Sequence, residues 1–159
     1  MKQELTPSAQ MVQEVLQTLG LTLEVIELPG STRTAVEAAQ AVGCQLGQIV
    51  KSLVFKTKRS EQAILVLVSG QNRVDERRIE TFLGEPLGKA DADFVRLHTG
   101  FVIGGVPPVA HLEKLETFID EDLMQYQELW AAAGTPHAVF RLSPDDLVKI
   151  TGGRLVRIK

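Results

Sequence analysis

Apolar residues along the chain change repeatedly from a helical spacing to a strand-like spacing. Val12, Val15, Leu16 and Leu19 lie at i, i+3, i+4 and i+7, which predicts an amphipathic helix after Thr6. Short runs rich in valine, isoleucine and leucine predict strands. The predicted helices cover residues 7–19, 34–43, 75–84, 93–98 and 143–152. The predicted strands cover residues 23–28, 50–56, 63–68, 101–103, 117–119, 129–133, 138–142 and 154–158.

The ends of these helices carry residues that satisfy or terminate a helical backbone. Thr34 and Glu37 form a capping box, and Ser143 stands before Pro144, which favours the first helical turn. Glycines follow most of the predicted helices, as expected for left-handed caps. Helices and strands alternate without an internal repeat or a linker, which predicts one mixed α/β domain over residues 1–159.

The composition is that of an ordinary globular domain. The chain has 159 residues, of which 44% are hydrophobic and 23% charged. Its only cysteine, Cys44, cannot form an internal disulfide. Residues 1–4 contain no apolar signal core, and no apolar run approaches the ~18 residues of a membrane span. A cytoplasmic protein with no membrane partner is therefore expected.

The charge balance limits the contacts expected with nucleic acid. A net charge of −3 and a pI of about 5.6 argue against a protein that wraps nucleic acid, because such binding depends on many lysines and arginines. Local basic clusters lie within residues 73–78 and 149–159, and each is more simply interpreted as a solvated face. A contact with RNA should therefore have a small footprint.

Lys51 has an unusual setting for a lysine. In a strand over residues 50–56 it shares a face with Leu53 and Phe55, because side chains alternate with period two. An ammonium group on an apolar face is unfavourable unless an anion or good acceptors meet it. Either Lys51 reaches water by its long stem, which the pattern alone favours, or it anchors a phosphate or carboxyl group.

Residues 104–108, with the sequence GGVPP, form the second feature of interest. Gly104 and Gly105 allow a ligand to approach the backbone and its N–H groups closely, while Pro107 and Pro108 stiffen the loop. Rigid N–H donors directed at a carbonyl oxygen suit an oxyanion site for acyl transfer. The alternative is an ordinary turn between two elements, which a bare GGxPP string favours.

Several common chemistries have no motif in the chain. His98, His111 and His137 are scattered without metal-ligand spacing, so no metal site is expected. There is no G-x-S-x-G elbow, no phosphate-binding loop and no dinucleotide fingerprint, and no cofactor is expected. Cys44 follows a helix-ending glycine and is interpreted as a small packed residue. The residues alone leave the function undecided.

Four segments together resemble one family over nearly the whole chain, from about residue 8 to residue 158. They are residues 31–39 (STRTAVEAA), 47–55 (GQIVKSLVF), 99–108 (TGFVIGGVPP) and 132–140 with 143–147 (AAGTPHAVF and SPDDL). Each string is weakly specific, but their order and spacing make the match strong. The chain resembles the YbaK/EbsC family, whose members are freestanding relatives of the editing domain in bacterial prolyl-tRNA synthetases.

The resemblance implies a fold and a set of site residues. The fold is a barrel-like mixed β-sheet surrounded by helices. The family lysine that holds the terminal adenosine of tRNA corresponds to Lys51, and the family G-x-x-x-P loop, which positions the aminoacyl carbonyl, corresponds to residues 104–108. The implied catalytic residues are Lys51, Gly104 and Gly105. The implied substrate-binding residues are Ser31, Thr32, Thr34, Val106, Pro108 and His137.

The resemblance also implies hydrolysis of mischarged aminoacyl-tRNA in trans, with the tRNA 3′ acceptor end as the partner. Such an ester can be cleaved by positioning and oxyanion donors without a side-chain nucleophile, with help from a group of the substrate itself. A synthetase or an elongation factor could supply further tRNA specificity. The competing hypotheses are a non-catalytic module that binds aminoacyl-tRNA or a synthetase, and a hydrolase of other small acyl esters.

Overall fold

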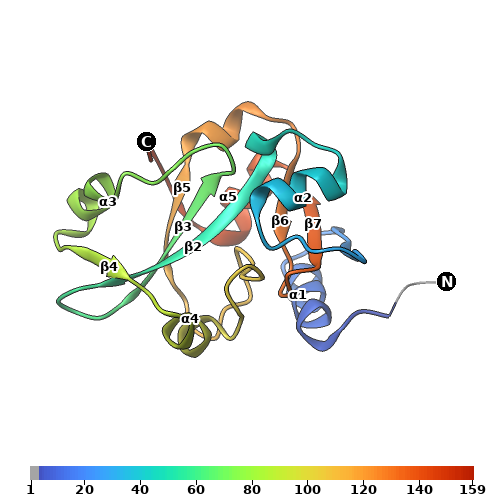
Figure 1. Ribbon diagram of the computed structural model, residues 1–159, viewed down its shortest axis with the longest axis horizontal. Helices are drawn as coiled ribbons and strands as arrows, with labels where there is room; N and C mark the ends of the chain where they lie inside the picture. The colour runs from blue at the N-terminus through green and yellow to red at the C-terminus, as the bar shows by residue number, and fades with distance from the viewer. Residues whose placement is uncertain (1–3) are drawn as a thin grey trace.

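The computed structural model describes residues 4–159, which form an eight-stranded mixed sheet with helices around it (Figure 1). The strands are β1 (Val25–Glu27), β2 (Ile49–Thr57), β3 (Ala63–Ser69), β4 (Leu87–Lys89), β5 (Glu116–Asp120), β6 (Leu129–Ala132), β7 (Ala138–Leu142) and β8 (Arg154–Val156). The α-helices are α1 (Pro7–Thr18), α2 (Ala35–Val42), α3 (Glu76–Leu83), α4 (Ala92–Thr99) and α5 (Pro144–Thr151). Two 3₁₀ helices, η1 (Leu46–Gln48) and η2 (Glu121–Gln125), complete the fold.

The sheet has an interruption beside its central strand. The strand order is β1-β7-β6-β2-β3-β5-β8, and β4 pairs with β2 outside this path. One edge of β2 pairs with β3 over residues 50–56. The other edge pairs with β6 only at residues 49–50 and with β4 only at residues 55–57. Within the described chain, residues 51–54 of β2 therefore have no strand partner on that edge.

Local sequence signals account for the helix ends. The Thr34 hydroxyl oxygen accepts a hydrogen bond from the backbone N–H of Glu37 (3.1 Å), and the Ser143 hydroxyl oxygen accepts one from Asp146 N–H (3.1 Å). Helix α4 is capped by Asp91, whose carboxylate accepts from Phe94 N–H (2.8 Å). Each cap satisfies a donor that the first helical turn leaves free. The sequence predicted the start of α4 at residue 93, and so missed Asp91 as its cap.

Strand β3 forms the centre of the core because it is buried on both faces. Leu65 and Leu67 join the larger hydrophobic cluster, which also contains residues of α1 and α5. Ile64, Val66 and Val68 join a smaller cluster beneath α3. Burial on both faces explains the continuous apolar run at residues 63–68 and the absence of polar alternation there.

Two predictions of local structure were wrong. Residues 101–103 form no strand, because Phe101 is buried while Val102 and Ile103 are exposed in a loop without a neighbouring strand. Strand β4 was missed, because a three-residue element with a glycine at its centre carries no periodic signal. The remaining predicted helices and strands are present, with ends shifted by up to two residues.

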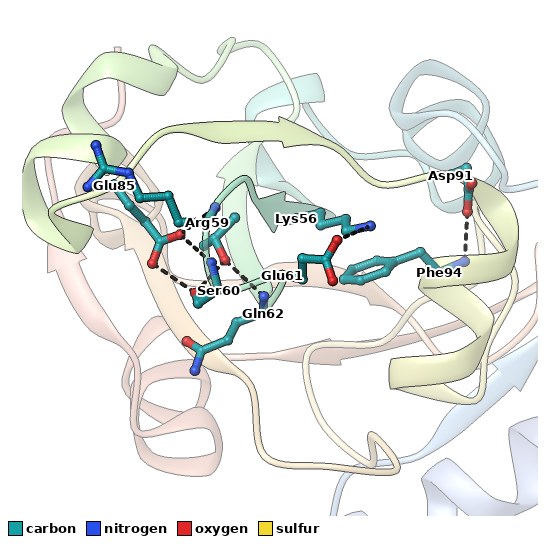
Figure 2. A network of polar contacts seen from close by, with 9 residues as sticks. Lys56, Arg59, Ser60, Glu61, Gln62, Glu85, Asp91 and Phe94 are labelled. Atoms are coloured by element: carbon teal, nitrogen blue, oxygen red, sulfur yellow. Dashed lines mark hydrogen bonds and ion pairs between the residues drawn. The ribbon is translucent and has the colours of Figure 1, made fainter.

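The turn between β2 and β3 is fixed by polar contacts that also hold the neighbourhood of β4 (Figure 2). The carboxylate of Glu85 accepts hydrogen bonds from the backbone N–H groups of Arg59 (3.1 Å) and Ser60 (3.0 Å). Lys56 pairs with Glu61 (3.6 Å) and lies over the ring of Phe94, 5.2 Å from its centroid. These contacts hold the far end of β2 against β4 and α4, and so fix one boundary of the interruption in the sheet.

Among residues 4–159, no helix has both the length and the apolar character needed to cross a membrane. The prediction that the chain lacks a signal core rests partly on residues 1–3, which lie outside the described residues.

Candidate active site

A cavity of about 590 Å³ lies at the interruption beside β2. Residues 49–55 of β2 form its floor, and β6, β7 and α2 form much of its apolar wall. The loop at residues 32–34, three residues of the glycine-rich loop (Ile103, Gly104 and Val106), Ala90 and Val95 also line it. Five of the predicted site residues line the cavity, namely Thr32, Thr34, Lys51, Gly104 and Val106. The other four, Ser31, Gly105, Pro108 and His137, are not part of the lining.

Lys51 is half-buried in the cavity wall. Its ammonium Nζ donates a hydrogen bond to the backbone oxygen of Asn72 (2.7 Å). A lysine ammonium has three N–H donors, so this contact leaves two for a ligand. Burial lowers the pKa of Lys51 below its ordinary value, the positive charge of Arg73 lowers it further, and Asp120 opposes both. Lys51 is therefore a partly desolvated cation, which suits an anionic or strongly polar ligand group.

The glycine-rich loop is folded as a compact turn. The backbone N–H of Gly105 donates to the carbonyl of Val102 (3.0 Å), and the Gly105 carbonyl accepts from Gly134 N–H (2.9 Å). A Cβ at Gly105 would lie 2.9 Å from the backbone of Thr135. The amide of Gly105 is thus used within the turn, and the donor role predicted for it does not fit this geometry.

Gly104 and Val106 provide the free amides of the loop. Both residues line the cavity, and within residues 4–159 neither backbone N–H has a hydrogen-bond acceptor. Gly104 has φ +90°, and a Cβ there would lie 2.5 Å from Cγ of Arg33. Val106 is only 4% exposed, and a buried N–H without an acceptor is unfavourable unless a ligand or water supplies one. These two amides are the loop's candidate oxyanion donors.

The predicted substrate loop at residues 31–34 is tied to the loop before β7. Thr32 N–H donates to the carbonyl of Pro136 (2.6 Å), and Nδ1 of His137 bonds the carbonyl of Gly30 (2.8 Å). The Ser31 hydroxyl oxygen accepts from the N–H of Arg33 (3.2 Å). Ser31 and His137 therefore do not line the cavity themselves. Their hydrogen bonds hold the loop that does.

In the part of the chain that the structure describes, two buried hydroxyl groups of the lining have no hydrogen-bond partner. Thr32 is 4% exposed, and its Oγ1 and the buried Oγ of Ser52 lack a hydrogen-bond partner within the described residues. A buried hydroxyl left unsatisfied costs about 1–3 kcal/mol, which a polar ligand group would recover. Sequence reasoning missed Ser52, although its place beside Lys51 in the otherwise apolar stretch of residues 49–55 was a usable signal.

His111 makes a hydrogen bond that holds the glycine-rich loop at residues 104–108. Its Nε2 lies 2.7 Å from the carbonyl oxygen of Pro107, which can only accept, so Nε2 carries the proton. Burial lowers the pKa of His111 below its ordinary value, and the bond to Pro107 partly offsets this. The folded state therefore favours the neutral imidazole.

We expect His111→Gln to be less stable than the wild type by about 1–2 kcal/mol at pH 7.5, because a buried hydrogen bond is lost. Since the folded pKa is depressed, the contribution of His111 is complete above its ordinary pKa of about 6.5 and is lost as the pH falls through the folded value. The difference in melting temperature between wild type and variant should thus shrink from pH 7.5 towards pH 5. A difference independent of pH would contradict the neutral assignment.

No group of three or more histidine, cysteine, aspartate or glutamate side chains in residues 4–159 is arranged to hold a metal ion. Cys44 is partly buried, and burial raises the pKa of its thiol, which disfavours the nucleophilic thiolate. The cavity offers the cationic side chains of Lys51 and Arg33, two unpartnered hydroxyls and free backbone amides.

Fold and cavity together define an α/β domain with a largely apolar cavity, which also holds Lys51, Arg33 and the free amides of one loop. Residues 30–150 match the family model described as the aminoacyl-tRNA editing domain. The chain belongs to this family, which confirms the YbaK-like resemblance and the predicted fold.

Similar proteins include both small proteins and parts of a large enzyme. A solved structure of a candidate trans-editing enzyme for prolyl tRNA synthetase is 52% identical, with a TM-score of 0.92 over 98% of this chain and 99% of that one. The uncharacterized protein YwhH of Bacillus subtilis is 29% identical over 124 residues, 78% of each chain. The proline–tRNA ligase of Limosilactobacillus fermentum is 30% identical over 122 residues, which are 74% of this chain but only 20% of the ligase.

Proposed function

We propose that this protein is a trans-editing hydrolase that cleaves the ester bond of mischarged aminoacyl-tRNA. The observation that carries the proposal is that Lys51, Gly104 and Val106 line one cavity and that, within residues 4–159, the amides of the two loop residues have no acceptor. Membership of the aminoacyl-tRNA editing domain family supports the substrate class. The 52% identical structure of a candidate trans-editing enzyme for prolyl tRNA synthetase supports tRNA charged in error by that synthetase.

In this proposal, Lys51 binds the 3′-terminal nucleotide. Its two remaining N–H donors suit a phosphate or ribose oxygen, and its partial burial strengthens such a contact. Gly104 and Val106 direct their N–H groups at the ester carbonyl oxygen and stabilise the negative charge that develops there. Both donors come from a loop held by the hydrogen bond of His111 and by the Gly105–Gly134 contact.

The chemical step then requires no side-chain nucleophile. A water oxygen adds to the carbonyl carbon, the bond from that carbon to the ribose oxygen breaks, and the ribose oxygen takes up a proton from the attacking water. The vicinal ribose hydroxyl lies beside the ester and can relay this proton, so the substrate itself assists. Free amino acid and uncharged tRNA are released.

The cavity also restricts the acyl group. Ala38, Val42 and Val139 are among the apolar lining residues, while Thr32 and Ser52 add two unpartnered hydroxyls. A volume of about 590 Å³ has to hold the acyl group together with part of the terminal ribose. We therefore propose a small amino acid as the cleaved group, with the hydroxyls available to its amino group.

A panel of mischarged tRNAs tests the function. Purified protein at catalytic concentration should release amino acid from tRNA for proline that carries a small wrong amino acid, and should spare the correctly charged prolyl-tRNA. Binding without release would favour a non-catalytic module of the same fold. Equal hydrolysis of free aminoacyl esters and of aminoacyl-tRNA would favour a general small-ester hydrolase.

The salt dependence of tRNA binding should be shallow. The net charge is −3, and the lining contains only two cationic side chains, Arg33 and Lys51. Each single-strand phosphate contact contributes a slope of ~0.7, so we expect a slope magnitude of about 1 to 3 in log K against log salt. The measurement is a binding titration from low to moderate salt. A slope corresponding to six or more contacts would contradict an interaction confined to the 3′ end.

A further inference from the structure

A buried polar network lies directly behind Lys51, at the ends of β3 and β5. The backbone oxygen of Asn72 accepts the hydrogen bond from Lys51 Nζ (2.7 Å). The side-chain amide of Asn72 donates to the carboxylates of Asp120 (2.9 Å) and Asp122 (2.8 Å). Asn72 is 8% exposed and Asp120 is 1% exposed. The residue that contacts Lys51 is therefore itself held by two acidic side chains.

Asp120 joins this network to the ends of two strands. One carboxylate oxygen accepts from Ser69 N–H at the end of β3 (3.0 Å) and from the Asn72 amide. The other accepts from the N–H of Asp122 (2.9 Å). An unpaired buried carboxylate is unfavourable, and here three hydrogen bonds satisfy it, although none of the three donors carries a charge. Two cations lie one residue away from Asp120 in this network: Lys51 through Asn72, and Lys159 through Asp122, whose carboxylate pairs with it (3.0 Å).

We propose that Asn72 and Asp120 are positioning residues that hold the Lys51 ammonium at the cavity wall. This inference rests on the proposed function, because it assigns Lys51 a role that needs a fixed position. A lysine side chain has four rotatable bonds, so an ammonium in a ligand site needs a fixed acceptor if its geometry is to be reproducible. The acceptor here is the backbone carbonyl of Asn72. Its position depends on the two hydrogen bonds from the Asn72 side-chain amide to Asp120 and Asp122, which we call the clamp on Asn72.

Asn72→Ala tests the clamp and leaves Lys51 itself unchanged. We expect kcat/KM for deacylation to fall roughly tenfold, the size of one hydrogen bond to a charged group. Thr117→Val is the matched control, since Thr117 is a buried polar residue on β5 whose hydroxyl, within residues 4–159, bonds only the carbonyl of Leu115 (3.0 Å). The control should lose stability to a similar extent and retain its activity. Full activity in Asn72→Ala would overturn the proposal.

A double-mutant cycle separates positioning from scaffolding. In a Lys51→Ala background, Asn72→Ala should cause no further loss of kcat/KM, because the residue through which Asn72 acts is absent. A second full tenfold loss there would show that Asn72 acts on the fold in general and would overturn the proposal. If Asn72→Ala does not fold, Asp122→Ala removes one of the two carboxylates that hold Asn72, and about a threefold loss is expected by the same reasoning.

A chemical readout keeps this inference separate from the proposed function. Competitive acetylation with acetic anhydride, followed by mass spectrometry, reports the reactivity of Lys51 relative to Lys149. Asn72→Ala should increase the relative labelling of Lys51 several-fold, because the backbone carbonyl that accepts from its ammonium is no longer held in place. Unchanged labelling would overturn the positioning role. Changed labelling in a protein that cleaves no mischarged tRNA would support the network and refute the deacylase.

Discussion

Lys51→Ala should lower kcat/KM for deacylation by roughly ten- to hundredfold in a protein that remains folded. The estimate corresponds to one hydrogen bond between charged groups, worth ~1.5–3 kcal/mol. Lys51 is half-buried, and burial lowers the pKa of its ammonium, so the folded state holds this charge at some cost. Its removal should therefore change the melting temperature little.

The matched variant is Lys51→Met, which retains the apolar stem of the side chain and removes only the charge and the donors. Lys51→Met and Lys51→Ala should lose the same activity, as measured by single-turnover release of amino acid from mischarged tRNA. If Lys51→Met is fully active, the ammonium has no part in the reaction and the stem only fills space. If both variants are active, Lys51 does not belong to the site.

The second large effect is expected in the glycine-rich loop. Substitution of Gly105 should mainly lower the stability, and substitution of Gly104 should mainly lower the rate. Gly105→Val should lower the melting temperature by roughly 4–10 °C, because its side chain would meet the Thr135 backbone, with a Cβ contact of 2.9 Å. Its amide is already bonded to Val102, so its main effect is on folding. This expectation differs from the catalytic role that the family resemblance implied for Gly105.

Gly104→Ala should instead act mainly on the rate. A Cβ at Gly104 would displace the stem of Arg33 and strain a backbone with φ +90°, which turns the free amide away from the ester. Loss of one oxyanion donor costs ~10²–10³ in kcat. Val106→Ala is the control, because its amide remains, and it should be much milder. Equal single-turnover rates in Gly104→Ala and wild type would remove this amide from the mechanism.

Much of the fold was readable because its signals are local. The cap at Thr34, the proline after Ser143 and the apolar run of β3 each determine an element within a few residues. Strand β4 has no such signal, since its three residues are ordered only by pairing with the end of β2. Residues 101–103 have the composition of a strand but no neighbour to pair with.

The site was predicted less completely, since its chemistry depends on contacts between distant segments. Lys51 and Gly104 were found because an ammonium on an apolar strand and a double glycine are unusual in themselves. The engaged amide of Gly105 and the unpartnered hydroxyl of Ser52 depend on three-dimensional neighbours. The clamp on Asn72 joins residues 48 and 50 positions apart, which a local pattern does not reveal.

The cavity beside β2 is built from two kinds of group: backbone groups, which are present whatever the side chains are, and side chains, which substitutions can change. Polar backbone groups on the unpaired edge of residues 51–54 exist whatever the side chains are, so a bound substrate can take the place of the missing strand. The surrounding wall, by contrast, is made of side chains such as Ala38, Val42 and Trp130. Under the proposed function, substitutions in that wall would resize the pocket for a different amino acid, while the backbone contacts proposed to orient the ester would stay the same. Such a scaffold can exchange one substrate for another by few mutations.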